Sequence, residues 1–303
     1  MKTLFFYLIF PGFLFSVVAG LMAGWVDRKL SARIQYRVGP PWYQNFLDII
    51  KLAGKEVIVP EGAKITFLLA PFFGFLSVSL VAAIVGLSIM QPLAGFVGDL
   101  IVVLYLLIIP AISLIVGASA SKNPLASIGA SREMKLVLGY ELPFLLAVIV
   151  IIIKTGGLIS LGAILEHQAS FMSNIVSFSG AIAFLVIVLC IQAKLGIVPF
   201  DMSEAEQEIM GGVLIEYSGF PLAVFKLTRW LLLYTMPLLV IVLFLGKDVS
   251  LLFLIAKYLG LLVIIILIKN TNPRLKIEQA LKFFWGPMTL LAVIAVVLAL
   301  FGL

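Results

Sequence analysis

The stretch Thr66–Met90, TFLLAPFFGFLSVSLVAAIVGLSIM, contains no charged residue. A helix needs about 20 apolar residues to cross a hydrocarbon core about 30 Å thick, so this stretch is long enough to span a membrane. Its apolar residues run continuously and do not alternate with a period of two, which favours a helix over a strand of a β-barrel. The stretch therefore predicts an all-α integral membrane protein.

The whole chain has the same character. Of its 303 residues, 63% are hydrophobic and only 12% are charged, whereas a soluble domain has about 25% charged residues. No linker divides the sequence, so we predict a single transmembrane domain over residues 1–303, built as a bundle of about eight helices. The predicted spans are residues 4–25, 66–90, 100–120, 136–153, 175–193, 213–245, 251–268 and 284–303.

Basic residues are distributed unevenly between the predicted loops. Most of the 21 lysines and arginines follow odd-numbered spans. Because positive charge is retained on the cytoplasmic side, we expect those loops in the cytoplasm, a location in the cell (plasma) membrane, and both termini outside. The net charge of +6 therefore indicates topology, and we expect no nucleic-acid partner.

The longest polar segment follows the first span and contains an amphipathic pattern over Tyr43–Ile58. Asp48, Lys51 and Lys55 fall on one face, and apolar residues occupy the rest. This pattern predicts a surface helix that lies along the cytoplasmic face of the membrane after the first span.

A later cytoplasmic loop, Pro199–Glu208, is unexpectedly acidic and carries Asp201, Glu204, Glu206 and Glu208. Ser203 and Glu206 have the spacing of a capping box, which predicts that a helix begins there. That helix would place Glu204, Glu208 and Glu216 on one face. Closely spaced carboxylates raise one another's pKa, as a proton relay requires. The alternative is a solvated loop that docks to a basic partner.

Charged residues also lie inside predicted spans. Glu141 follows Tyr140 in the fourth span, while Glu216, Lys226 and Arg229 lie in the sixth. A charge in the bilayer costs about 2.5–3.5 kcal/mol on insertion scales, so such residues pair with one another or line a wet path. We predict that Glu141 and Glu216 belong to a proton relay, with static ion pairs as the alternative.

Metal chemistry has little support in the sequence. The chain has one cysteine, Cys190, and one histidine, His167. Zinc and iron–sulfur sites need clusters of such residues, so we expect no metal or cofactor on this chain.

Several motifs together resemble the NuoH family, the first membrane subunit of complex I. This family includes the corresponding membrane subunits of formate hydrogenlyase and of archaeal membrane-bound hydrogenase and sulfane reductase complexes. The acidic motif VPFDMSEAEQE at Val198–Glu208, followed by EYSG at Glu216–Gly219, carries most of the resemblance. Further similar segments are Asp27-Arg28, Arg33–Pro40, Asp48–Lys51, Lys55-Glu56, Gly139–Glu141 and Pro273–Gln279.

The resemblance implies a non-catalytic subunit of an oxidoreductase complex. It implies hydrophilic redox partners (hydrogenase-like large and small subunits and an iron–sulfur subunit), antiporter-like membrane subunits that move protons or sodium, and lipid. Iron–sulfur clusters, and NiFe in a hydrogenase, would then belong to those partners. The implied relay residues are Tyr140, Glu141, Asp201, Glu204, Glu206, Glu208, Glu216, Lys226 and Arg229. The implied docking residues for the redox arm are Arg28, Arg33, Arg37, Asp48, Lys51, Lys55, Glu56 and Arg274.

Two departures from the family pattern bear on quinone binding. Complex I members carry Glu-x-Asn-Arg before the Pro-Phe-Asp motif, where this chain has Lys194-Leu195-Gly196-Ile197. Arg229 also stands where the family has an acidic residue. We therefore favour the quinone-independent branch, with ferredoxin as donor and protons or a sulfur compound as acceptor, and the residue usage is compatible with an archaeon. The alternatives are a quinone-binding subunit of complex I and an independent secondary transporter, which the absence of paired half-helices disfavours.

Overall fold

The computed structural model describes residues 6–63 and 65–303, and every regular element in these ranges is a helix. The long apolar helices are α2 (Phe13–Ile34), α4 (Ile65–Met90), α7 (Pro124–Lys154), α9 (Phe178–Lys194), α11 (Gly219–Phe244) and α12 (Leu251–Thr271). Two further spans are divided, one into α5 (Asp99–Leu106) and α6 (Ile109–Ala120), the other into α13 (Ile277–Phe283), η4 (Phe284–Met288) and α14 (Thr289–Leu300).

The shorter helices lie in the connections. They are α3 (Gln44–Ala53), η1 (Pro92–Ala94), α8 (Leu161–Ser170), η2 (Asn174–Val176), α10 (Glu206–Ile209) and η3 (Gly212–Leu214). The predicted surface helix is therefore present as α3, and it is shorter than the predicted range Tyr43–Ile58 because it ends at Ala53, before Gly54.

The predicted bundle of about eight helices is confirmed. Within the described residues, seven helical segments are long and apolar enough to cross a membrane, and α9 adds a shorter apolar helix of 17 residues. The protein is therefore a multi-pass membrane protein. The predicted start of the first span at Leu4 lies outside the described residues, and the first helical segment continues to Ile34, beyond the predicted end at Trp25.

The other predicted spans also have different bounds in the structure. The second begins at Ile65, the fifth covers Phe178–Lys194, the seventh ends at Thr271, and the eighth covers Ile277–Leu300 and not 284–303. Three more differ for local reasons. The fourth begins at Pro124, not at Leu136, because Asn123 caps the helix by accepting a 2.8 Å hydrogen bond from the Leu125 amide. The third is interrupted before Pro110, which has no N–H to continue the helix. The sixth begins at Gly219 and not at Val213, since residues 213–218 form part of η3 and a loop.

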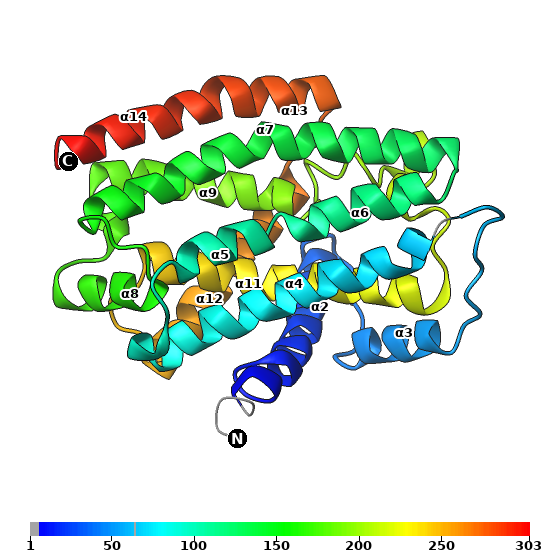
Figure 1. Cartoon of the computed structure of the whole chain (residues 1–303), viewed down its shortest axis with the longest axis horizontal. Helices are drawn as coiled ribbons and strands as arrows, with labels where there is room; N and C mark the ends of the chain where they lie inside the picture. The colour runs from blue at the N-terminus through cyan, green and yellow to red at the C-terminus, as the bar shows by residue number, and fades with distance from the viewer. Residues whose placement is uncertain (1–5, 64) are drawn as a thin grey trace.

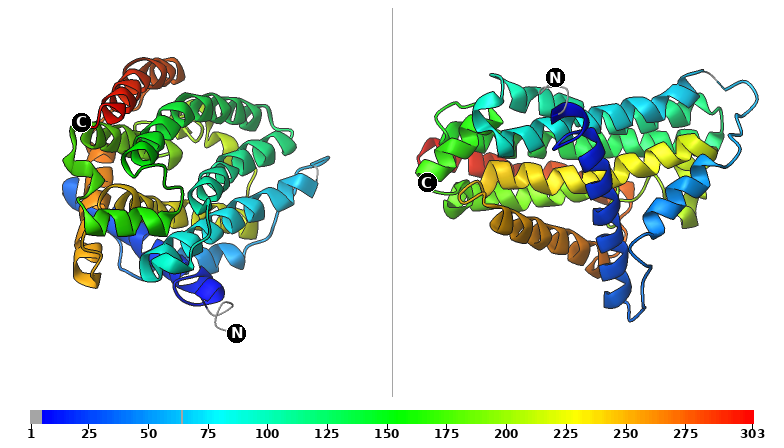
Figure 2. Two further views of the ribbon diagram at one scale, coloured as in Figure 1. Left: turned by 60° about the vertical axis from the view of Figure 1, so that its left-hand side comes forward. Right: turned by 90° about the horizontal axis from the view of Figure 1, so that it is seen from below.

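Most of the helices run along the long axis of the molecule, with α11 inside the bundle and α4, α7 and α9 around it (Figure 1). Helix α2 instead crosses the others steeply (Figure 2). The crossing is possible because Gly20 and Gly24 lie against α11, where a Cβ at Gly24 would come within 2.6 Å of the Trp230 ring. Small residues allow this close approach of helices in a membrane.

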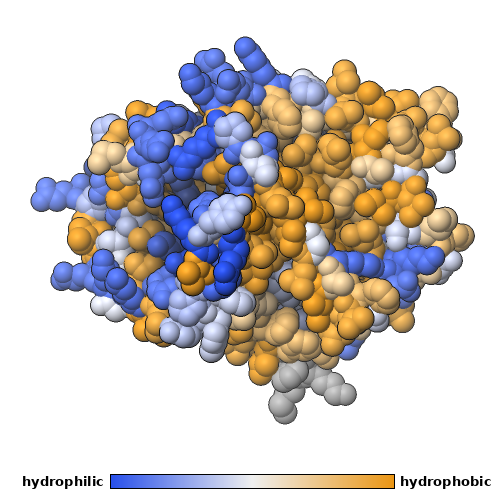
Figure 3. Space-filling view, turned by 180° about the vertical axis from the view of Figure 1, so that it is seen from behind, coloured by the Kyte–Doolittle hydropathy of each residue, from blue (hydrophilic) through white to orange (hydrophobic). Residues whose placement is uncertain are grey.

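Hydrophilic residues gather at one end of the bundle, around a hollow (Figure 3). This polar end contains α3 and the loops predicted to be cytoplasmic, which contact one another. Ser218 accepts a 2.9 Å hydrogen bond from the Ile58 amide, and Arg274 forms a 2.8 Å ion pair with Asp201. The charged loops therefore lie together at one end of the bundle. That this end faces the cytoplasm stays a prediction.

Candidate functional site

The acidic loop is a compact turn and not the start of a long helix. Helix α10 covers only Glu206–Ile209, and Met210, Gly211 and Gly212 all have positive φ angles of 52°, 91° and 47°. Residues in this left-handed region end a right-handed helix. The predicted helix that begins at Ser203 and aligns Glu204, Glu208 and Glu216 is therefore wrong.

The acids of this loop pair with arginines from other parts of the chain. The pairs are Asp201 with Arg274 at 2.8 Å, Glu204 with Arg229 at 2.5 Å, and Glu208 with Arg132 at 2.5 Å. Such charge-assisted bonds fix a loop more firmly than neutral ones. Glu206 is exposed and forms no ion pair among the described residues. The loop is thus tied to α7, to α11 and to the segment before α13.

Glu133 is a buried acid in α7 that the sequence analysis did not single out. It is 5% exposed, and Ser203, Glu204 and Arg229 surround it. It was missed because the predicted fourth span began after it, although it lies two helical turns before Glu141 and hence on the same face of α7. The acidic loop and the interior of the bundle therefore meet at this carboxyl group.

Glu141 is paired, deeper in the bundle, with Lys194 of α9. The lysine ammonium lies 2.9 Å from the carboxylate, and its side chain is only 2% exposed. It also lies 4.4 Å from the centre of the Phe144 ring and 5.3 Å from that of Tyr140, within the range of cation–π attraction. The second carboxylate oxygen of Glu141 is buried and has no partner among the described residues. The predicted relay residues Tyr140 and Glu141 thus surround one buried cation.

Two cavities adjoin these charges. One of about 240 Å³ is lined by Glu133, Lys194, Glu204, Glu206 and other residues of α6, α9 and α11. The second, of about 320 Å³, lies between α2, α3, α11 and α12. Arg229 and Lys226 line both, so the cavities meet at this part of α11.

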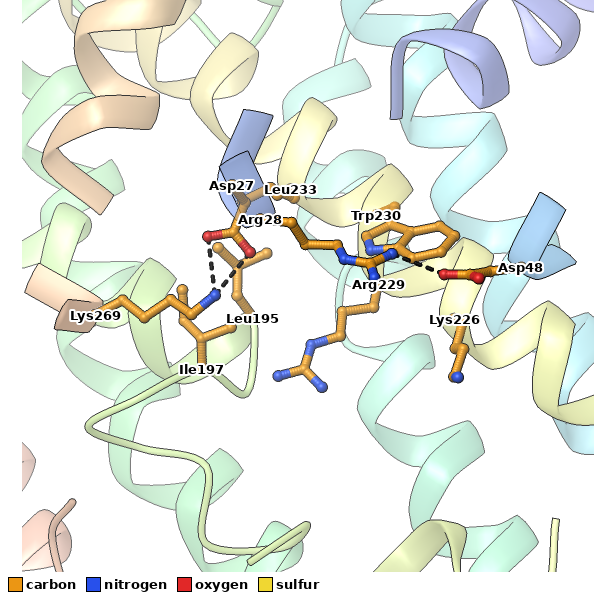
Figure 4. Close-up of a pocket in the computed structure, with 10 residues that line it drawn as sticks. All are labelled: Asp27, Arg28, Asp48, Leu195, Ile197, Lys226, Arg229, Trp230, Leu233 and Lys269. Atoms are coloured by element: carbon orange, nitrogen blue, oxygen red, sulfur yellow. Dashed lines mark hydrogen bonds and ion pairs between the residues drawn. The ribbon is translucent and has the colours of Figure 1, made fainter. Parts of the chain in front are cut away.

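The second cavity is bordered by two further ion pairs (Figure 4). Lys269 contacts Asp27 at 2.7 Å, and Arg28 contacts Asp48 at 2.7 Å. The side chain of Arg229 extends from α11 into the space between these pairs, whereas that of Lys226 lies beside Asp48 (Figure 4). Lys226 is exposed and forms no ion pair within residues 6–63 and 65–303, so it is a candidate to bind an anion or a partner carboxylate.

Helix α3 is fixed to α2 through Arg28, which also donates a 2.7 Å hydrogen bond to Asn45. Buried Asn45 in turn donates to the Leu21 carbonyl at 2.8 Å. Burial acts to raise the pKa of Asp48, but hydrogen bonds from Gln44 and Arg28 outweigh it, so the pKa lies below its usual value of 3.8. Asp48 is therefore ionised at neutral pH and holds α3 in place.

The predicted docking residues fall into two groups. Arg28, Asp48 and Arg274 form the internal ion pairs described above. The others are exposed and form no ion pair in the described part of the chain: Arg33, Arg37, Lys51, Lys55 and Glu56. The second group is free to contact another protein.

Glu216 has a different kind of partner from the acids of the loop. It accepts a 2.5 Å hydrogen bond from the Asn123 side chain, at the start of α7. The structure therefore joins Glu216 to a helix cap, whereas Glu204, Glu133, Lys194 and Arg229 line one cavity.

Comparison with known proteins shows similarity along nearly the whole chain. Residues 6–300 match the NADH dehydrogenase family. The H subunit of NADH-quinone oxidoreductase from Thermomicrobium roseum is 32% identical, over 93% of this chain and 91% of that protein. The same subunit from a Geobacillus species is 31% identical, over 90% of this chain and 86% of that protein. One chain of the membrane-bound sulfane sulfur reductase, an archaeal respiratory membrane complex, superposes with a TM-score of 0.83 at 27% identity, covering 94% of this chain and 96% of that one.

Proposed function

The chain belongs to the NADH dehydrogenase family, among the relatives of the H subunit of NADH-quinone oxidoreductase, and from this we propose that it anchors and couples a ferredoxin-driven, ion-pumping respiratory complex. The sequence resemblance to the NuoH family is confirmed. The proposed complex is of the membrane-bound hydrogenase or sulfane reductase type. Its redox arm docks at the polar end of the bundle, and antiporter-like subunits move protons or sodium.

The observation that carries this proposal is the set of charges leading inward from the acidic loop. Glu204 and Arg229 form an ion pair beside Glu133, and Lys194 and Glu141 form a second pair further along α7 and α9. Glu133 is buried beside the first pair, and charge–charge interactions are screened least at buried groups. A movement of the acidic loop that separates Glu204 from Arg229 therefore changes the electrostatic environment of Glu133.

In this mechanism, Glu133 holds or releases a proton at its carboxyl group according to the position of Arg229. When Arg229 is paired with Glu204, its positive charge is shared between Glu204 and Glu133. When the acidic loop releases Arg229 from Glu204, the full charge acts on Glu133 and favours its ionised form. Glu141, paired with Lys194, is the next acid along α7. The exposed basic residues Arg33, Arg37, Lys51 and Lys55 bind the redox arm, whose electron transfer moves the loop.

The charges also favour a complex that does not use quinone. Sites for large apolar ligands are lined mainly by hydrophobic and aromatic side chains. The cavity between α2, α3 and α11 is instead lined by six charged residues among ten: Asp27, Arg28, Asp48, Lys226, Arg229 and Lys269. Ile197, in place of the family arginine, lines the same cavity and supplies no hydrogen bond to a quinone oxygen.

A quinone-binding role is the second candidate, because the relatives at 31–32% identity are subunits of NADH-quinone oxidoreductases. A photoreactive quinone added to the purified complex separates the two. We expect no specific labelling of Asp201 or of the residues that line either cavity. Two results together would overturn our preference: unlabelled quinone prevents labelling of these residues, and a photoreactive lipid of the same chain length does not label them.

Coupling is tested with Glu141→Gln and Glu216→Gln in membrane vesicles supplied with reduced ferredoxin. We expect both to reduce gradient formation. Glu216→Gln can keep its contact with Asn123, so the complex should assemble, whereas Glu141→Gln leaves Lys194 without a counter-charge and should also lower assembly. Glu278→Gln is the matched control, since Glu278 is exposed and unpaired among the described residues. Unchanged gradients in both variants would refute the relay.

The proposal also fixes the orientation in the membrane. We expect the polar end in the cytoplasm of the cell and both termini outside. Single cysteines replacing Lys51 and Lys247, which are both exposed, should react with an impermeant reagent only from the cytoplasmic and only from the outer side, respectively. The opposite labelling would reverse the orientation and remove the proposed docking face from the cytoplasm.

A further inference from the structure

A third cavity lies at the end of the bundle opposite α3. It has a volume of about 320 Å³ and is bounded by residues at the end of α7, at the end of α8 and before α9. These three segments lie together at one end of the molecule (Figure 1). The cavity shares no residue with the two cavities of the candidate functional site, and the coupling mechanism does not use it.

Two basic side chains line this cavity, and neither has an acidic partner among the residues that the structure describes. Lys154 is the last residue of α7, and it forms no ion pair or side-chain hydrogen bond within the described residues. His167 of α8 packs its ring at 4.8 Å from that of Phe171. Its Nδ1 is buried without a partner in the described part of the chain. The other ring nitrogen, Nε2, can donate a hydrogen bond.

The rim of the same cavity is apolar and exposed. Phe171 is 69% exposed, Met172 is 58% exposed and Val176 is 61% exposed. These residues lie between the end of the span α7 and the start of the span α9. The cavity thus lies where two spans end, with its basic groups inside and exposed apolar groups around them.

We propose that this cavity binds the headgroup of an anionic phospholipid of the outer leaflet. The phosphodiester is held by the Lys154 ammonium, the His167 Nε2–H and the Ser173 hydroxyl, and an acyl chain lies along Phe171, Met172 and Val176. Basic pockets between transmembrane helices bind anionic lipid headgroups. A free phosphate fits the basic groups but leaves the apolar rim exposed to water. This site is independent of the donor and acceptor of the complex.

The purified full-length chain, stripped of lipid and returned to nanodiscs, provides the test. A phosphatidylglycerol with a photoreactive acyl chain is present at a few per cent in a phosphatidylcholine bilayer, and labelled peptides are identified by mass spectrometry. We expect labelling of residues 168–178, and at least severalfold less labelling there with photoreactive phosphatidylcholine. Equal labelling by the two lipids would overturn the proposal, and this comparison needs no variant.

Variants then assign the basic groups. Lys154→Gln should weaken phosphatidylglycerol labelling of residues 168–178 by about fivefold, the effect of one basic charge near a membrane surface. His167→Leu should weaken it as well, because it removes the Nε2–H donor. Lys247→Gln is the control, because Lys247 is exposed but does not line the cavity. Competition by millimolar inorganic phosphate would identify a free-anion site and contradict the lipid. Protection of residues 168–178 by a protein subunit in the intact complex, with no lipid labelling, would also contradict it.

Discussion

The buried ion pair between Lys194 and Glu141 leads to the most quantitative prediction. Lys194→Met removes the cation and leaves Glu141, whose side chain is 15% exposed, beside a lysine position that was 2% exposed. Removing one partner of a buried pair costs about 3–5 kcal/mol. At 1.36 kcal/mol per factor of ten, this changes the unfolding equilibrium constant roughly 150- to 5,000-fold. Glu141→Gln should cost a similar amount, because it leaves the ammonium uncompensated.

The assay is unfolding of the purified chain in mixed micelles with increasing SDS, followed by tryptophan fluorescence. The double variant Lys194→Met with Glu141→Gln should recover most of the loss, so the coupling energy should be about 4 kcal/mol or more. Lys135→Met, an exposed lysine in the same helix as Glu141, should have little effect. A coupling near 0.6 kcal/mol, the average for hydrogen bonds between membrane helices, would refute the description of Lys194 and Glu141 as a desolvated ion pair.

Three further predictions concern the polar end of the bundle. Arg28→Gln removes a bridge to Asn45 and Asp48 and should speed hydrogen exchange of α3 amides about fivefold, as a loss of about 1 kcal/mol implies; unchanged exchange would show that other contacts hold α3. Because the pKa of Asp48 is lowered in the folded protein, its contribution to α3 docking is complete above pH 3.8. That contribution is lost as the pH falls through the pKa of the folded state. A fluorophore on α3 should therefore report release at low pH in the wild type but no such transition in Asp48→Asn. Gly129→Ala places a Cβ within 2.7 Å of the Val213 amide nitrogen and should destabilise the acidic loop by about 1–3 kcal/mol, measured as a lower melting temperature; a melting temperature equal to that of the wild type would show that the loop moves without cost.

The number and order of the helices could be predicted because hydrophobic length is a local property. Each span is visible in its own residues, and the surface helix α3 is visible in its own periodicity. Helix ends were less predictable. The Gly211-Gly212 pair is a turn signal, and giving it more weight than the Ser203–Glu206 spacing would have ended helix α10 correctly.

The charged partners could not be predicted because they depend on which helix faces meet. Lys194 and Glu141 are separated by 53 residues, and Arg28 and Asp48 by 20. Glu133 was overlooked for the related reason that Arg132 and Lys135 beside it resemble a solvated loop. Only the fold shows that Arg132 turns to Glu208 while Glu133 points inward to Ser203.

The central claim is that buried charge beside the acidic loop couples electron transfer to ion movement. Glu133→Gln in the intact complex tests it most directly, with ferredoxin oxidation and gradient formation measured together in inverted membrane vesicles. We predict that ferredoxin oxidation continues while the ions moved per electron fall at least severalfold, and that the Glu278→Gln control matches the wild type. An unchanged number of ions per electron in Glu133→Gln would contradict the claim.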